Sequence, residues 1–232
     1  MTSSRFVTQA KKNRSETRLS AIVPVAGMGH RMKSYGPKCL LPADKKHSII
    51  ERTIENIKEA YPFAEIIVVV GFEADRIIKA LPKDIRVVEN QIYETTNVVE
   101  SLRLALNNSV TDSVLIVYGD LIFNDSTIKG LDENFSCAVI DSKQRFKDEE
   151  IGVTVVDGIL TNFAYGLETK WAQIICLTGK ELTMLKEFCF DRKKNKMYPF
   201  EIFNMIIDKG GIIRAVENPS MEIKEIDSLK DL

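Results

Sequence analysis

The sequence lacks the features of disulfide-rich, zinc-binding and membrane-spanning proteins. Its 232 residues include four cysteines (Cys39, Cys137, Cys176 and Cys189), and no two of them form a C-x-x-C pair. The longest apolar runs, such as residues 66–70, have the length of a strand and fall far short of the ~20 residues of a membrane span. A net charge of −1 gives no basic excess to attract nucleic acid or an acidic membrane. We therefore expect reduced thiols and a cytoplasmic protein with no nucleic-acid or membrane partner.

Histidine is also scarce, and it indicates neither a metal site nor a nucleophilic centre. The two histidines, His30 and His47, have no metal-ligand spacing to each other or to a cysteine. The sequence places no histidine partner beside Ser34 or Cys39. A serine or cysteine nucleophile therefore has no support, and other residues must supply the chemistry.

The first eighteen residues differ in composition from the rest of the chain. They carry one acidic residue and five basic residues: Arg5, Lys11, Lys12, Arg14 and Arg18. A targeting peptide is the alternative interpretation, because such segments are rich in arginine and serine. The segment has no clear apolar face, however, so we expect residues 1–18 to form a flexible tail and residues 19–232 to form one domain.

Strand-like and helix-like segments alternate along that domain. Apolar strands are expected over residues 21–26, 65–70 and 113–118, with amphipathic helices between them. The spacing Ser48-x-x-Glu51 predicts a capping box at one helix start, and Thr178-x-x-Glu181 predicts another. The alternation predicts an α/β fold with a mainly parallel sheet covered by helices.

A glycine-containing loop after the first strand is the most informative part of the sequence. Gly27-Met28-Gly29 follows Ala26, and Arg31 and Lys38 bring two permanent cations to the same loop. Glycine lets backbone N–H groups turn toward an anion without a Cβ in the way. The pattern therefore predicts a polyphosphate site. A dinucleotide-binding fingerprint fits less well, because its third glycine is missing and its acidic residue would come too late.

Two further motifs supply carboxylates. Tyr118-Gly119-Asp120 ends a predicted buried strand, at the sheet edge where α/β folds bind ligands. Glu225-Ile226-Asp227 lies close to the C-terminus. A turn or helix cap at Asp120, and an N-cap at Ser228, are the structural alternatives.

The polar turn before the third predicted helix is a weaker signal. Asn97 precedes that helix and Ser101 lies one turn inside it. Asn97 reads equally well as an N-cap or as a ligand contact.

Together, Gly27-Met28-Gly29, Arg31 and Pro37-Lys38 resemble the signature loop of the nucleotidyltransferase superfamily. These enzymes join a nucleoside triphosphate to a sugar or alcohol phosphate and release pyrophosphate. The resemblance implies a single-domain, Rossmann-like nucleotide-diphospho-sugar transferase fold, with a mainly parallel mixed sheet covered by helices on both faces. The gap from Arg31 to Lys38 resembles that of cytidylyltransferases, whereas the aspartate motifs resemble sugar-phosphate and choline-phosphate nucleotidylyltransferases.

The resemblance also implies roles for individual residues. Arg31 and Lys38 would be catalytic, and Asp120 and Asp227 would hold Mg²⁺ as the cofactor. The implied nucleotide-binding residues are Ala26, Gly27, Met28, Gly29, Asn97, Ser101 and Gly119.

The expected reaction is transfer of a nucleoside monophosphate, with CMP favoured, to a small phosphorylated acceptor. We expect residues 151–172 to recognise that acceptor. The sequence leaves open whether the chain forms a homodimer. It also leaves two alternatives: a glycosyltransferase, although Gly119-Asp120-Leu121 is not its Asp-x-Asp pattern, and a non-catalytic nucleotide-binding subunit, although the implied set is intact. Trp171 and Tyr165 read as core residues or as a cage for a quaternary ammonium.

Overall fold

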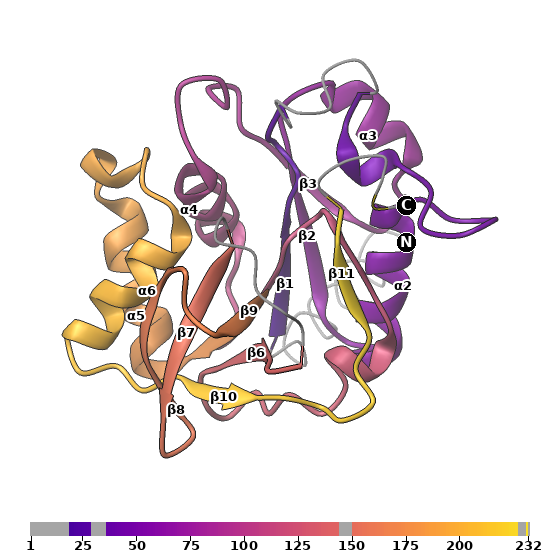
Figure 1. Ribbon diagram of the computed structural model, residues 1–232. Coiled ribbons are helices and arrows are strands. Elements are labelled where there is room, and N and C mark those ends of the chain that lie inside the picture. The colour runs from indigo at the N-terminus through magenta and orange to yellow at the C-terminus, as the bar shows by residue number, and fades with distance from the viewer. Residues whose placement is uncertain (1–18, 29–35, 144–149, 227–230, 232) are drawn as a thin grey trace, which may run out of the picture.

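The structure is a computed structural model that describes residues 19–28, 36–143, 150–226 and 231 (Figure 1). The basic tail, residues 1–18, lies outside this part of the chain. So do three residues of the predicted site: Gly29, Arg31 and Asp227.

A mixed sheet runs through the centre of the molecule (Figure 1). Its strands are β1 (Leu19–Pro24), β2 (Glu65–Val70), β3 (Arg86–Glu89), β4 (Ser113–Val117), β6 (Cys137–Asp141), β7 (Ile151–Val156), β8 (Ile159–Tyr165), β9 (Thr169–Thr178) and β10 (Arg214–Val216). Within the described residues they pair in the order β3-β2-β1-β4-β9-β6-β10-β8-β7. The first four pair in parallel, and β8 and β9 run against the other strands. The expected mixed α/β sheet is confirmed.

Helices cover both faces of this sheet (Figure 1). One face carries α2 (Ile49–Ala60) and α3 (Ala74–Ala80), and the other carries α4 (Val98–Asn108), α5 (Gly179–Phe190) and α6 (Pro199–Asp208). Three single 3₁₀ turns are η2 (Lys38–Leu40), η3 (Asp125–Thr127) and η4 (Arg192–Lys194). No helix in the described part of the chain is long and apolar enough to cross a membrane.

The central strands are mostly apolar because both of their faces are buried, and their polar residues Ser20 and Ser113 are hydrogen-bonded. Side chains alternate between the faces of a strand, so neighbouring residues enter different cores. Ile22 of β1 packs in the core that contains Leu102 of α4, whereas Val23 packs in the core that contains Ile54 of α2. Continuous apolar runs therefore identified these strands correctly.

One of the two predicted capping boxes is confirmed. At the start of α2, the Ser48 N–H donates to Glu51 Oε2 at 2.8 Å, and the Glu51 N–H donates back to Ser48 Oγ. The box at α5 is wrong. Thr178 Oγ1 donates to the Asp112 carbonyl instead, and Glu181 accepts from Ser136 Oγ and from the backbone of Ile212. These side chains join separate segments, so tertiary contacts replace the local cap.

A two-stranded ribbon was not predicted. β5 (Leu121–Phe123) pairs antiparallel with β11 (Ile223–Glu225), and Glu225 lies opposite Leu121. Beyond the ribbon, the Ile226 N–H donates to the Asp120 carbonyl at 2.9 Å. The ribbon therefore brings the C-terminal segment to the end of β4.

The start of α4 is tied to the segment that leads into α6. Glu100 is buried and accepts hydrogen bonds from Arg103 and, at 3.1 Å, from Arg192 of η4. The Asn97 N–H donates to the Asn195 carbonyl at 2.8 Å. Hydrogen bonding from Arg103 lowers the pKa of Glu100 below its ordinary value of 4.5. The ionised carboxylate therefore stabilises the folded state.

We expect Glu100→Gln to lower the Tm at pH 7 by about 3–6 °C, because a hydrogen bond to a charged group contributes ~1.5 kcal/mol or more. The contribution is complete above the ordinary carboxyl pKa and is lost as the pH falls through the lower folded-state value. Thermal unfolding from pH 7 to pH 3 should therefore show the gap between the two proteins closing. A gap that stays constant with pH would contradict this role.

Candidate active site

A cavity of about 280 Å³ opens at the carboxyl ends of β1 and β4. These strands are neighbours, and the chain continues from β1 to β2 on the opposite side, so the strand order reverses between them. Ligands in α/β folds bind in such a crevice. The cavity brings together five of the residues implied by the sequence: Gly27, Lys38, Asn97, Gly119 and Asp120.

The charged centre of the cavity is a pair from two different segments. Lys38, the first residue of η2, places Nζ 3.5 Å from Oδ2 of Asp120, which follows β4. Their side chains keep exposed fractions of 17% and 25%, so both reach the cavity. A cation and a carboxylate at this distance can together hold a phosphate and a phosphate-bound metal ion.

The two glycines in the cavity wall serve different purposes. A Cβ on Gly119 would lie 2.1 Å from Cγ1 of Val25, so only glycine lets β4 end against the end of β1. A Cβ on Gly27 would meet no described atom within 4 Å. Packing within the described chain therefore does not require glycine at position 27, and its backbone stays open to a ligand.

Asn97 and Ser101, the two implied nucleotide-binding residues near the start of α4, differ in their relation to the cavity. Asn97 is the N-cap of α4, because its Oδ1 accepts a hydrogen bond from the Val98 N–H at 2.8 Å. Asn97 also lines the cavity, so the N-cap role does not exclude contact with a ligand. Ser101 is buried inside α4 and accepts from Nδ2 of Asn90. The structure does not bring Ser101 to the cavity wall.

Ala26 and Met28, on either side of Gly27, do not line the cavity either. Ala26 is buried, and its carbonyl accepts from the Phe72 N–H at 3.0 Å. This bond holds the chain against the end of β2 just before it reaches Gly27.

The donor set fits a phosphate-bound magnesium ion in part. Among the described residues, no three histidine, cysteine, aspartate or glutamate side chains converge as a metal site. Mg²⁺ bound with a nucleotide needs only one or two protein carboxylates, because phosphate oxygens and waters complete its octahedron. Asp120 supplies one carboxylate. Ile226, which hydrogen-bonds to Asp120, directly precedes the second candidate, Asp227.

The structure adds cavity residues that the sequence did not reveal. Gln173 of β9 and Tyr198 and Pro199 at the start of α6 also line this cavity. Gln173 has a φ of 57°, in the left-handed region that glutamine rarely adopts. No motif marks these residues, because they reach the cavity through the pairing of β9 with β4 and the docking of α6.

The aromatic cage suggested for Trp171 is wrong. Trp171 is 2% exposed and packs edge-to-face against Tyr118 and Phe163, while its Nε1–H donates to the Ile174 carbonyl. Tyr165 is exposed and contacts Phe200 instead. The core interpretation of Trp171 is therefore confirmed.

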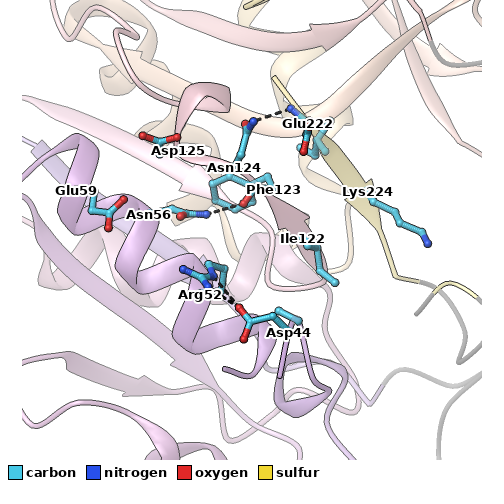
Figure 2. A pocket seen from close by; sticks show the side chains of 12 residues that line it. Asp44, Arg52, Asn56, Glu59, Ile122, Phe123, Asn124, Asp125, Glu222 and Lys224 are labelled. Carbon is cyan, nitrogen blue, oxygen red and sulfur yellow. Dashed lines mark hydrogen bonds and ion pairs between the residues drawn. The ribbon is translucent and has the colours of Figure 1, made fainter. Parts of the chain in front are cut away.

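A larger cavity, of about 540 Å³, lies between α2 and the ribbon of β5 and β11. Figure 2 shows an ion pair between Arg52 and Asp44 and a hydrogen bond from Asn56 to the Phe123 carbonyl, while Glu59 and Lys224 are drawn without a partner among the residues shown. It contains none of the residues implied by the sequence. The smaller cavity is therefore the candidate active site.

Comparison with known proteins identifies the family of this chain. Residues 21–161, more than half of the chain, match the family of MobA-like NTP transferase domains, and the protein belongs to this family. The nucleotidyltransferase resemblance is thereby confirmed. The matched region contains Gly27, Lys38 and Asp120.

The curated relatives are longer proteins. The bifunctional protein GlmU of Thermosipho melanesiensis is 28% identical over 170 residues, which cover 71% of this chain and 34% of that protein. GlmU of Methanococcus maripaludis is 31% identical over 142 residues, covering 58% of this chain and 33% of that protein. The chain spans about a third of the length of these relatives.

Solved structures share the whole fold. The CTP:phosphocholine cytidylyltransferase LicC of Streptococcus pneumoniae superposes with a TM-score of 0.70 at 20% identity, covering 92% of this chain and 96% of that one. The inositol-1-phosphate CTP transferase of T. maritima gives a TM-score of 0.73 at 18% identity, covering 93% and 91%. The Rossmann-like nucleotide-diphospho-sugar transferase fold expected from the sequence is confirmed.

Cys39 lines the cavity as a neutral thiol. Burial raises its pKa to about 12, and all four cysteines are buried and unpaired. A thiolate nucleophile is therefore not available at neutral pH.

We expect the native protein to react slowly with a thiol reagent such as DTNB at pH 8. The same protein in guanidinium chloride should release four equivalents rapidly, one for each cysteine. Absorbance at 412 nm follows both reactions. A thiol that reacts within seconds in the native protein would show that one of these cysteines is accessible.

Proposed function

We propose that the protein is a magnesium-dependent nucleotidyltransferase that transfers a nucleoside monophosphate, CMP favoured, to a small phosphorylated alcohol or sugar and releases pyrophosphate. The observation that carries this proposal is the pairing of Lys38 with Asp120 across the crevice, beside the open backbone of Gly27. Membership of the MobA-like NTP transferase family supports it.

Each charged residue has a distinct role in this proposal. The backbone at Gly27 and Gly29 binds the triphosphate, and Arg31 neutralises the phosphates that leave as pyrophosphate. Lys38 stabilises the charge that develops at the α-phosphate. Asp120 and Asp227 would hold Mg²⁺, which lowers the charge repulsion between the two phosphorylated substrates when it is bound.

The acceptor needs no general base. A phosphate monoester has a second pKa of about 6 and is already an anion at neutral pH. Its oxygen can attack the α-phosphate in line once the two substrates are aligned. Catalysis then rests on positioning and electrostatic stabilisation, which agrees with a site that offers a lysine and carboxylates but no thiolate.

CTP is the proposed donor for two reasons. The short gap between Arg31 and Lys38 resembles that of cytidylyltransferases, and two proteins with the same fold are described as using CTP, with phosphocholine and inositol 1-phosphate respectively. Asn97 and Tyr198 lie on the cavity wall, where they can contact the nucleoside.

The donor preference is tested by thermal unfolding with CTP, UTP, dTTP, GTP and ATP, each with and without Mg²⁺. We expect a magnesium-dependent rise in Tm that is largest with CTP. A ligand at ~100 times its Kd stabilises a protein by about 2.7 kcal/mol, or several degrees for this length. A pyrophosphate-release assay with phosphocholine, inositol 1-phosphate and glucose 1-phosphate then tests turnover. Nucleotide binding without pyrophosphate would favour a non-catalytic subunit, and no response to any nucleotide would contradict the proposal.

Lys38→Ala should lower kcat by ~10²-fold or more, because it removes a preorganised charge next to the reacting phosphate. The CTP-dependent rise in Tm should change much less. Lys45→Ala, which removes an exposed cation from the loop that follows η2, is the matched control and should leave kcat unchanged. Equal kcat values for the Lys38 variant and wild type would remove Lys38 from the mechanism.

Asp120→Asn should abolish the magnesium-dependent part of the nucleotide response, because an amide oxygen carries no charge for the metal ion. Circular dichroism should show an unchanged fold. Asp125→Asn, at an exposed carboxylate of the neighbouring η3, serves as the control. An Asp120 variant with wild-type dependence on Mg²⁺ concentration would exclude Asp120 as a ligand.

A further inference from the structure

β9 is irregular at Gln173, the residue that faces the end of β4. β6 pairs Ala138 with Ile175 and Ile140 with Trp171, so the β9 strand carries two extra residues at this point. Gln173 lies inside this bulge with a φ of 57°, and its carbonyl accepts from the Tyr118 N–H. Bulges re-aim side chains beside active sites, and a strained backbone away from a turn is retained where it serves a function.

Gln173 lines both the candidate active site and a much smaller pocket of about 10 Å³. Lys38 and Asp120 share the first cavity with it, and Lys170 and Glu225 share the second. Within the described part of the chain, its amide has no hydrogen-bond partner, and it is half-buried. A half-buried amide of a residue that lines the candidate active site has both a donor and an acceptor to offer a ligand.

The order of the strands assigns this amide to one of the two substrates. The phosphate loop follows β1, Asp120 follows β4, and Gln173 lies on β9, the next strand outward. In an in-line transfer the attacking and leaving groups lie on opposite sides of the α-phosphate. With the leaving pyrophosphate over the β1 loop and the α-phosphate at Lys38 and Asp120, the acceptor lies over β9.

We propose that Gln173 is the acceptor-positioning residue of this enzyme, and that its side-chain NH₂ donates a hydrogen bond to the acceptor's phosphate. This inference rests on the proposed nucleotidyltransferase function. A neutral amide suits the position, because it orients the attacking phosphate without neutralising the charge that makes it a nucleophile. The site thus extends beyond the expected acceptor segment of residues 151–172.

The test compares Gln173→Gly with Asp157→Gly. Asp157 also has a positive φ, of 51°, but it lies in the exposed turn between β7 and β8. Glycine adopts a positive φ without strain, so neither substitution should lower the Tm. The probes are CTP with Mg²⁺, and phosphocholine, inositol 1-phosphate and glucose 1-phosphate as acceptors.

We expect Gln173→Gly to raise the KM for the acceptor by about tenfold or more, the value of one hydrogen bond. The CTP-dependent rise in Tm should stay as in wild type, and Asp157→Gly should change neither quantity. Gln173→Glu, which keeps the size of the side chain and adds a negative charge, should raise the same KM further. If the glycine variant is unstable, the acceptor KM of Gln173→Glu tests the inference in its place.

Three outcomes would overturn the inference. An unchanged acceptor KM in Gln173→Gly and Gln173→Glu would do so while leaving the proposed function intact. If the CTP-dependent rise in Tm became smaller while the acceptor KM increased, Gln173 would have a structural role. A wild-type protein that neither responds to CTP nor releases pyrophosphate would remove the proposed function, and this inference with it.

Discussion

The parallel pairing of β1 with β4 is the constraint on which the candidate site depends. Its register runs from Leu19 opposite Ser113 to Ile22 opposite Ile116, so both strands end at the same level of the sheet. The approach is so close beyond the paired residues that Gly119 has no room for a Cβ beside Val25. This register places the loop that carries Lys38 against Asp120. A shift by one residue would move every side chain of the shifted strand into the opposite core, so the packing of the two cores holds this register in place.

Neighbouring segments complete the crevice at the end of this strand pair. β9 runs antiparallel beside β4 and contributes Gln173 to the crevice, while the start of α6 contributes Tyr198 and Pro199. The hydrogen bonds of Glu100 and Asn97 hold the start of α4 to the segment before α6. The cavity walls thus come from segments that are far apart in the sequence, and each is fixed by contacts outside the cavity.

The chemistry that these walls can support is electrostatic. Burial keeps Cys39 protonated, and among the described residues the charged side chains that line the crevice are those of Lys38 and Asp120. Such a site suits a pair of phosphorylated substrates, because one supplies the nucleophile and the other the leaving group. The larger cavity beside α2 lies away from these strand ends and contains neither Lys38 nor Asp120, and its Arg52 already pairs with Asp44. Cavity size therefore does not identify the site, whereas the arrangement of unlike charges at a strand end does.

The sequence by itself determined the alternating α/β order, the buried strands and the two motifs that meet in the crevice. These follow from local patterns: apolar runs, glycines after a strand, and a carboxylate at a strand end. The sequence did not predict the ribbon of β5 and β11, the bulge at Gln173 or the burial of Ser101, and it wrongly expected a capping box at Thr178. Each of these depends on partners from distant segments, such as Asp112 and Ser136, whose proximity is set by strand order and helix docking. Local sequence patterns determined which residues could bind a phosphate, and only the tertiary structure decided which of them face the same cavity.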